Sequence, residues 1–246
     1  MVKVKIREAV AADIPTLARI GADAFQEEPI YEHFFPRRDR HALDYRRFFL
    51  HDLRRMLYTP GQIIVVAEQA QAPQESASAV ALEKTLPKVV GYATFIRTGS
   101  KKELATWKPD SWRKKCCRFT VWLSQLVCLA LAPNRAVSLA TINAYYRQAE
   151  AIHAPYLKET TSKIDFKTLA VDMDYQRQGI GAQLVEWCGM RARTENVQVF
   201  GDSSTKGLPL YSRNGCKEIG RIHLPKQVAR EKEIGAMDVV VLRWQA

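Results

Sequence analysis

Three residues at fixed spacing carry the clearest chemical signal in the chain. Gln176, Gly179 and Gly181 form a Q-x-x-G-x-G string between an apolar segment and a segment with helical periodicity. Glycines at such a turn let the backbone approach a ligand closely, and the first amides of the following helix have no partners within the helix. Together with the positive end of the helix dipole, these amides can bind phosphate. The string predicts a phosphate-binding turn; an ordinary tight strand-to-helix connection is the alternative.

Two other phosphate motifs do not fit these residues. A dinucleotide-binding fingerprint needs a third glycine where the chain has Leu184, and a P-loop needs a Gly-Lys-Ser/Thr string that the chain lacks. The sequence therefore argues against a dehydrogenase and against a P-loop kinase.

A second string, SSTKGLPLYSRNGCKEIG at 203–220, follows the first. With both strings the chain resembles the GCN5-related N-acetyltransferase (GNAT) superfamily, whose motif A reads L-x-V-x-P-x-[YF]-Q-x-x-G-x-G and whose motif B reads S-x-x-G-x-x-L-Y-x-x-x-G-F. The matching residues are Leu169, Val171, Tyr175, Gln176, Gly179, Ile180 and Gly181 in motif A and Ser204, Gly207, Leu210, Tyr211 and Gly215 in motif B. Met173 and Cys216 depart from the usual proline and phenylalanine. The resemblance is strong over 163–222, weak over the first 70 residues and absent over 99–160.

This resemblance implies acetyl-CoA as a co-substrate. In the superfamily the motif A strand and the next strand splay apart, and the pantetheine arm completes the sheet as an added strand would. The diphosphate would lie on the glycine turn, and a main-chain amide near the thioester would stabilise the oxyanion that forms there. The residues expected at the cofactor are Leu169, Ala170, Val171, Gln176, Arg177, Gln178, Gly179, Ile180, Gly181, Ala182, Ser204 and Tyr211.

The resemblance also suggests the catalytic groups. Tyr211 lies where many family members have the acid that protonates the departing thiolate, and a tyrosine that only packs on the cofactor is the alternative. For the base that deprotonates the acceptor ammonium, Asp165 and Asp202 are the carboxylates placed at strand ends. A carboxylate is a weak base unless burial raises its pKa, so a chain of ordered waters remains open as a third choice.

Four aromatic residues, Phe25, Tyr31, Phe34 and Phe35, cluster where the superfamily's first two helices wall the acceptor pocket. They would make the acceptor partly apolar or aromatic; simple core packing is the alternative.

The elements that must position these groups follow from hydrophobic periodicity. We expect strands at 2–6, 62–68, 89–97, 166–173 and 197–202 and in 216–224 and 236–244, and helices at 14–25, 41–58, 179–194 and 208–213. This order predicts one α/β domain over 1–246, with a mixed, mostly antiparallel sheet flanked by helices and splayed central strands. Residues 69–88 read as an exposed loop, and about 99–162 as a helical insertion.

Within that insertion, Phe119 to Ala132 is the longest uncharged apolar run, and it is shorter than the roughly 20 residues that a membrane span needs. No stable membrane insertion is expected. Trp122, Leu126, Leu129 and Ala130 fall opposite Thr120, Ser124 and Gln125 on a helical wheel, which predicts a helix packed on the core. A membrane-surface or partner-binding helix is the alternative.

Composition narrows the remaining classes of function. With 47% hydrophobic residues and only 12 Gly and 11 Pro, the chain is globular rather than disordered. The formal net charge is +11, but no aromatic RNA-binding motif accompanies the basic segments 37–55 and 101–118, so we expect solvated helix faces and no nucleic acid partner. The histidines are scattered, and no metal site is expected.

Cysteines lie at 116, 117, 128, 188 and 216 without paired spacing, which indicates a reducing compartment. The first residues, MVKVKIREA, lack the apolar stretch of a signal peptide, so a cytoplasmic location is expected. The favoured function is an N-acetyltransferase that acts on a small-molecule amine by direct attack in a ternary complex. The alternatives are a protein or peptide N-acetyltransferase and a non-catalytic CoA-binding regulatory protein. The acceptor and the oligomeric state cannot be read from the sequence.

Overall fold

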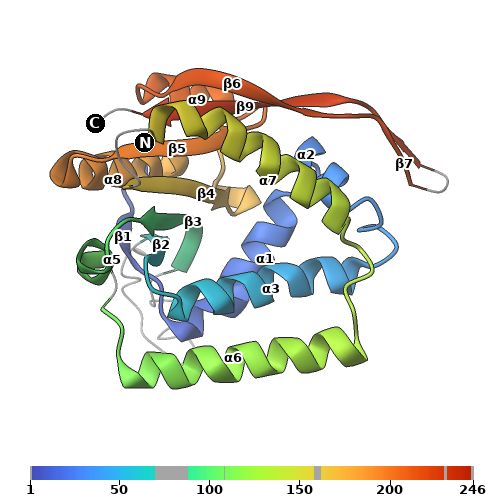
Figure 1. Cartoon of the computed structure of the whole chain (residues 1–246), viewed down its shortest axis with the longest axis horizontal. Coiled ribbons are helices and arrows are strands. Elements are labelled where there is room, and N and C mark those ends of the chain that lie inside the picture. Colours follow the sequence, from blue (N-terminus) through green and yellow to red (C-terminus); the bar gives the residue numbers. More distant parts are fainter. Residues whose placement is uncertain (1, 70–87, 108, 158–161, 230–231, 245–246) are drawn as a thin grey trace, which may run out of the picture.

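The computed structural model describes residues 2–69, 88–107, 109–157, 162–229 and 232–244. Its main sheet has the strand order β1-β2-β3-β4-β5-β9-β6 (Figure 1). The strands are β1 (Lys5–Glu8), β2 (Gln62–Gln69), β3 (Lys88–Thr98), β4 (Lys163–Val171), β5 (Gln198–Ser203), β6 (Lys217–Leu224) and β9 (Met237–Trp244). Most of the loop expected at 69–88 lies outside the described residues.

Neighbouring strands of this sheet pair antiparallel, except that β4 and β5 run parallel. A parallel pair needs a crossover connection, and α8 (Ile180–Glu195) provides it. The predicted mixed, mostly antiparallel α/β fold is therefore confirmed.

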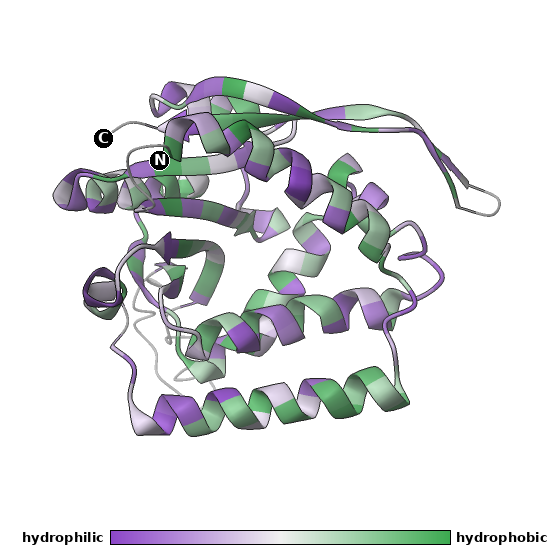
Figure 2. Cartoon of the chain, in the orientation of Figure 1, coloured by the Kyte–Doolittle hydropathy of each residue, from purple (hydrophilic) through white to green (hydrophobic). Residues whose placement is uncertain are grey.

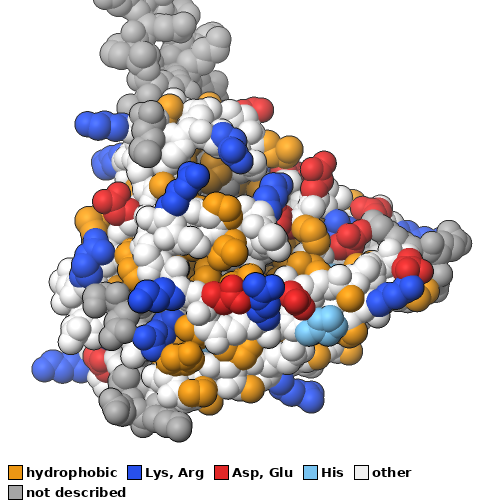
Figure 3. Space-filling view, turned by 90° about the horizontal axis from the view of Figure 1, so that it is seen from above, with side chains coloured by type: hydrophobic (Ala, Val, Ile, Leu, Met, Phe, Trp, Pro, Cys, Tyr) orange, Lys and Arg blue, Asp and Glu red, His pale blue; other side chains and the backbone are white. Residues whose placement is uncertain are grey.

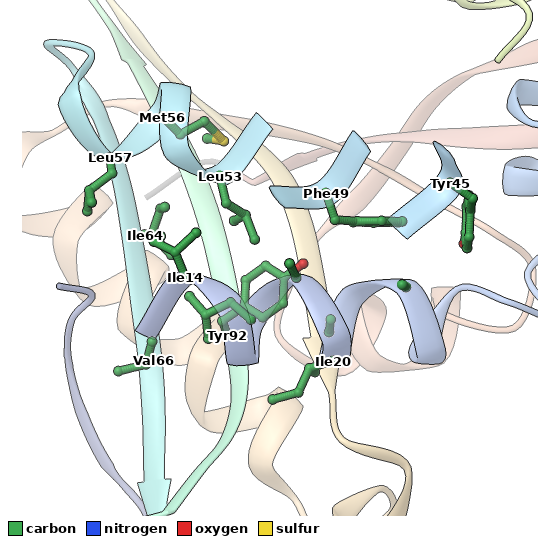
Figure 4. Close-up of a cluster of buried hydrophobic side chains, with 14 of the residues drawn as sticks. Ile14, Ile20, Tyr45, Phe49, Leu53, Met56, Leu57, Ile64, Val66 and Tyr92 are labelled. Atoms are coloured by element: carbon green, nitrogen blue, oxygen red, sulfur yellow. The ribbon is translucent and has the colours of Figure 1, made fainter. Parts of the chain in front are cut away.

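Helices cover both faces of the sheet. On one face α1 (Ile14–Ala24) and α3 (Ala42–Tyr58) lie over β2 and β3, and Figure 4 shows their side chains meeting Ile64, Val66 and Tyr92 of the strands. β-Branched and aromatic residues on the strands thus pack on the apolar stripes of the helices. On the other face, α8 buries Ile180 and Leu184 in a second core.

Three helices lie between β3 and β4 in the described part of this connection: α5 (Lys101–Trp107), α6 (Trp112–Leu131) and α7 (Leu139–His153). They are followed by the short 3-10 helix η2 (Ala154–Leu157). α7 packs on β6 and β9 through a third apolar cluster that includes Tyr145, Ile222 and Val239. α6 packs beside α3, at the side of the molecule away from β6 and β9 (Figure 1).

The expected packing of the apolar run Phe119–Ala132 on the core is wrong. α6 has no buried residue, and Trp122, Leu126 and Leu129 are 52%, 42% and 67% exposed. The physical reason is that the side of α6 that faces α3 is partly polar. Arg118 donates to the carbonyl of Tyr58 over 3.2 Å and the Gln125 amide donates to that of His51 over 3.0 Å, so the apolar side chains turn outward.

A small hairpin, β7 (Gln227–Ala229) and β8 (Lys232–Ile234), stands between β6 and β9 and was not expected from the sequence. It is attached to α2 (Pro29–Phe34), because the buried His33 has Nε2 at 2.9 Å from the Gly235 carbonyl oxygen and Nδ1 at 3.2 Å from the Gln227 amide nitrogen. The Gln227 amide also donates to Thr141 of α7 over 3.1 Å. The hairpin, α2 and α7 are thereby joined on one side of the sheet.

Candidate active site

The sheet forks between β4 and β5. These strands pair only from Lys163 with Gln198 to Phe166 with Gly201. Beyond that point β4 continues to Val171 along β3 alone, and β5 continues to Ser203 along β9 alone. The strands therefore separate as the sequence predicts, and each presents an open edge to the gap.

The open edge of β4 offers two main-chain amides. The amide of Asp172 donates to the Val90 carbonyl over 2.9 Å, so the backbone of Asp172 faces β3. Because this orientation alternates along a strand, the amides of Leu169 and Val171 point away from β3 and toward the gap. The amide of Ala170 points back to β3, and its side chain is buried in the core beneath α1 and α3. Of the three expected contacts on β4, two thus face the gap.

The turn after β4 has the geometry of an anion-binding nest. Arg177 and Gly179 both have positive φ, at 62° and 86°, and α8 begins directly after them at Ile180. The amide of Gln183 donates to the Gly179 carbonyl over 3.3 Å, so the amides of residues 180–182 lie in the first turn, where a helix offers donors without internal acceptors. Alternating backbone conformations of this kind turn successive N–H groups toward one point.

The side chains of the turn support this shape. The Gln176 amide donates to the Val171 carbonyl over 3.2 Å, and the Gln178 amide donates to the Asp174 carbonyl over 3.2 Å. Asp172 accepts from the Asp174 amide over 3.3 Å and from Arg19 of α1 over 2.7 Å. These bonds hold the turn against both β4 and α1.

Gly181 is not required by packing within the protein. A Cβ added there would meet its nearest neighbours, Leu210 and Leu169, at 3.4 and 3.6 Å, which is ordinary van der Waals contact. An alanine would therefore fit at this position within the protein itself.

Tyr211 reaches the fork from the side of α8. It lies on α9 (Leu208–Arg213), and its ring packs edge-on against Phe166 with centroids 5.6 Å apart. Both rings line a small apolar cavity, together with Val185, Val199, Gly201, Cys216, Leu242 and Trp244. Burial raises the pKa of Tyr211, so its phenol keeps its proton through the neutral range. Ser204 accepts from the Gly207 amide over 3.4 Å and so helps to start α9.

Asp202 reaches the fork from the opposite face, which α7 covers. Tyr145 of α7 donates to Oδ2 of Asp202 over 2.6 Å, and the buried Oδ1 has no hydrogen-bond partner within the described part of the chain. Burial raises the pKa of Asp202, while the Tyr145 bond and the charge of Lys167 oppose this rise. A carboxyl with a raised pKa is a stronger base when ionised.

Asp165, the other candidate base, lies in a different setting. It stands on the part of β4 that is still paired with β5, opposite Phe200, and it forms an ion pair with Lys163 at 2.9 Å. The structure therefore separates the two carboxylates, and Asp202 is the one that stands beyond the last β4–β5 pair.

The aromatic cluster divides into two parts. Phe25 stacks on Tyr31 with centroids 4.4 Å apart, and Phe34 packs edge-on against Tyr145 at 5.1 Å. Phe35 is only 1% exposed and packs against Tyr45 and Phe48, so it is a core residue in this structure. Through Tyr145, Phe34 is the member of the cluster that is linked to Asp202.

Tyr145 is the residue that sequence reasoning missed. It lies in the segment without family resemblance and 57 positions before Asp202. No local motif marks it, since its role depends on how α7 crosses the sheet. Its neighbour Tyr146 also faces the fork region, with the ammonium of Lys167 5.1 Å from its ring centroid.

Comparison with known proteins agrees with this geometry. Residues 127–218 match the family model of the acetyltransferase (GNAT) domain. No curated protein sequence matches the chain significantly. Among the described residues, no group of three or more His, Cys, Asp or Glu side chains is arranged to hold a metal ion.

Three solved structures with similar folds are remote in sequence. A Corynebacterium glutamicum structure, titled as histone acetyltransferase HPA2 and related acetyltransferase, has a TM-score of 0.56 and 15% identity, with 98% of this chain and 96% of that chain covered. The Drosophila melanogaster polyamine N-acetyltransferase, which forms N-acetylagmatine, has a TM-score of 0.54, 14% identity and coverages of 99% and 100%. Arabidopsis thaliana NAA60 in complex with acetyl-CoA has a TM-score of 0.51, 14% identity and coverages of 99% and 98%.

The family match covers the forked strands, the glycine turn and Tyr211, and the similar structures share the fold around them. Residues 127–218 thus match the acetyltransferase (GNAT) domain model, and the chain as a whole shares its fold with solved acetyltransferases.

Proposed function

We propose that this protein is a GNAT acyltransferase that moves an acetyl group from acetyl-CoA to the amine of a small molecule, by direct attack in a ternary complex. The observation that carries the proposal is the fork of β4 and β5, which opens directly after Phe166 and Gly201. A backbone site for the cofactor lies at one end of this fork, and a buried carboxylate lies at the other.

The main chain would hold the cofactor. The amides of Leu169 and Val171 are oriented to pair with the pantetheine arm, and the turn from Arg177 to Ala182 is shaped to receive the diphosphate. Arg177 is exposed and adds a positive charge beside the turn. Bound acetyl-CoA supplies the activated acyl thioester, and the protein positions it.

Asp202 and Tyr145 would receive the acceptor. An ammonium group at Oδ1 of Asp202 would give that oxygen the partner that it lacks within the described residues. Tyr31 and Phe34 supply apolar surface nearby, whereas Phe35 is placed in the core. The site therefore suits an amine carried on an apolar or aromatic body.

The two candidate catalytic groups approach the fork from opposite faces. Asp202 takes the proton from the acceptor ammonium, and the free amine can then attack the thioester carbonyl. The amide of Leu169 or Val171 stabilises the charge that develops on the carbonyl oxygen. As the carbon–sulfur bond breaks, Tyr211 gives its proton to the departing thiolate. In this scheme no cysteine acts as a nucleophile; Cys188 is buried and burial raises its pKa.

Enclosure and charge support a small acceptor over a protein. α7 crosses the acceptor side and is held to β6, α2 and the β7–β8 hairpin. A protein acetyltransferase for basic tails would need an acidic groove, yet the face in Figure 3 carries Lys and Arg interspersed with Asp and Glu. The protein alternative is still tested, because one similar structure is titled as a histone acetyltransferase.

The test is a panel of amines and basic peptides incubated with acetyl-CoA, with free thiol as the readout. The proposal expects turnover with small arylalkyl or polyamine substrates and little with peptides. Turnover with peptides alone would contradict the small-molecule acceptor but would still support the acetyltransferase activity.

Tyr211→Phe tests whether Tyr211 is the catalytic acid. It also tests the alternative that the protein only binds CoA and is not an enzyme. We expect kcat to fall about 100-fold with acetyl-CoA affinity unchanged, because only the proton donor is lost. Tyr58→Phe, at the end of α3, serves as the matched control. A wild-type chain that binds acetyl-CoA but turns over no amine would favour a CoA-binding regulatory protein.

We also propose that the protein works in the cytoplasm. All five cysteines are free in the structure, which supports a reducing environment. Labelling of these thiols after rapid lysis in acid would test it, since a disulfide in the isolated protein would contradict the assignment.

A further inference from the structure

α6 is amphipathic, but its partly polar face packs against the protein and its apolar face points outward. Arg118, Val121, Gln125 and Cys128 follow helical spacing and face α3, where Arg118 and Gln125 bond to its carbonyls. The opposite face is apolar, and its residues are also spaced as one helical stripe: Trp112, Phe119, Leu123, Leu126 and Ala130. Surface helices normally bury such a stripe against the core.

These outward residues, here called the α6 outer face, are strongly exposed. Trp112 is 78% exposed, Phe119 59% and Leu123 47%, and Leu129 and Leu131 beside them are 67% and 81% exposed. Contiguous exposed apolar surface of this kind marks an interaction site.

Charge along the helix has one sign. Arg113, Lys114, Lys115 and Arg118 occupy its first turns, and the chain has no acidic residue from Ser111 to Ala149. Arg118 also pairs with Asp110 at 3.4 Å, while Arg113 and Lys115 are exposed to solvent. Figure 2 shows the result, with a hydrophilic beginning and a mainly hydrophobic second half of α6.

We infer that the α6 outer face docks the enzyme on the surface of an anionic phospholipid membrane. Interfacial helices combine Lys and Arg with Trp, Phe and Leu in this manner, and they lie in the plane of the interface with the apolar stripe among the acyl chains. Trp112 on this face and the exposed Trp122 beside it are of the residue type that favours the headgroup level. No helix in the described residues is long and apolar enough to span a bilayer, so the attachment is peripheral.

The net charge of the protein also favours a membrane over a second copy of the chain as the partner of the α6 outer face. Two copies would each carry a formal net charge of +11 and would repel one another, whereas anionic lipid attracts both the helix and the whole protein. The position of α6 permits such docking, since it lies on the side of the molecule away from β6 and β9 (Figure 1). The inference does not depend on the proposed acceptor.

The experiment is co-sedimentation of the full chain with two kinds of vesicle. One contains phosphatidylcholine alone, and in the other about one lipid in three is the anionic phosphatidylserine. We expect binding to the anionic vesicles that weakens as salt increases. Phe119→Ser with Leu123→Ser should reduce it at least about tenfold, and so should Arg113→Glu with Lys115→Glu.

Two matched controls carry the same changes elsewhere. Met190→Ser alters an exposed apolar residue of α8, and Lys217→Glu alters an exposed lysine of β6. Both controls should bind vesicles as the wild type does. Since the altered α6 residues are exposed, melting temperature and acetyl-CoA affinity should be unchanged in every variant, which separates lost docking from unfolding.

Several results would overturn the inference. One is no binding to anionic vesicles, and another is equal binding by the α6 variants. Equal binding to neutral vesicles would remove the role of charge. A wild-type dimer that becomes monomeric through Phe119→Ser with Leu123→Ser, without vesicle binding, would assign the face to a second copy instead.

Discussion

The two ends of the fork differ in the groups that form them: one consists of main-chain amides and the other of side chains. The end proposed to hold acetyl-CoA, here called the cofactor end, consists of main-chain amides from one continuous segment, β4 through the first turn of α8, and its shape depends on positive φ at Arg177 and Gly179. The acceptor end consists of side chains from separate elements, with Asp202 on β5, Tyr145 on α7 and Phe34 on α2. In the proposed function, main-chain geometry binds the acetyl-CoA and side chains select the acceptor.

The largest expected effect is at the cofactor end. Gly181→Val should weaken acetyl-CoA binding by more than about 100-fold, because the added methyl groups would press on Leu210 and Leu169 and displace the first turn of α8, which is proposed to hold the diphosphate. Gly181→Ala is the graded control, since its Cβ meets only ordinary contacts within the protein. Isothermal titration with acetyl-CoA measures both, and unchanged affinity with a folded Gly181→Val protein would contradict a backbone-built cofactor end.

At the acceptor end, loss of the proposed base alone should reduce activity. Asp202→Asn is expected to lower kcat/KM for the amine about 100-fold while leaving acetyl-CoA affinity unchanged. Because burial raises the pKa of Asp202, the ionised form costs stability at neutral pH, and this cost appears as pH rises above the ordinary carboxyl pKa. The same variant should therefore melt about 1–3 °C higher at pH 7. Equal activity of the variant and the wild type would transfer the base role to water or to Asp165.

These two ends also differ in how far the sequence reveals them. The glycine turn, the fork and Tyr211 were predictable because a short local motif specifies them. Tyr145 was not, since its contact with Asp202 depends on the path of α7, and the outward face of α6 was assigned to the core. A helical wheel shows that a stripe exists, but the partner of that stripe is decided by polar residues such as Arg118 and Gln125, which bond to α3.

The stability of the acceptor end should depend on pH, because titratable groups gather there. Burial, with help from Lys163, lowers the pKa of His153 to about 4. His153 packs on Phe200, and Asp165 and Lys167 are the other charges near it. The folded protein binds this proton less readily than the unfolded chain does, so stability is full above about pH 6.5 and falls as pH drops toward about 4.

We expect a loss of about 2 kcal/mol or less between pH 7.5 and pH 5 from this residue. His153→Gln should flatten that part of the curve in chemical denaturation. His41→Gln, at the residue that directly precedes α3, is the matched control. A slope that persists in His153→Gln would assign the pH dependence to other groups.

The smallest effect concerns the charge beside the turn. Arg177→Gly removes the guanidinium but keeps the positive φ that the turn requires, so the backbone site should survive. Acetyl-CoA affinity should fall only about threefold, in line with an exposed ion pair, and should become less sensitive to salt. A loss as large as that of Gly181→Val would mean that side-chain charge, rather than the main chain, dominates the cofactor end.

The attachment of α7 to β6, α2 and the hairpin has an evolutionary consequence. Substitutions on α2 or α7 can reshape the acceptor pocket while β4, the turn and α8 remain as they are. In the proposed function, new amine preferences would thus arise by changes in the region around Tyr145 and Phe34, without altering the residues proposed to hold acetyl-CoA.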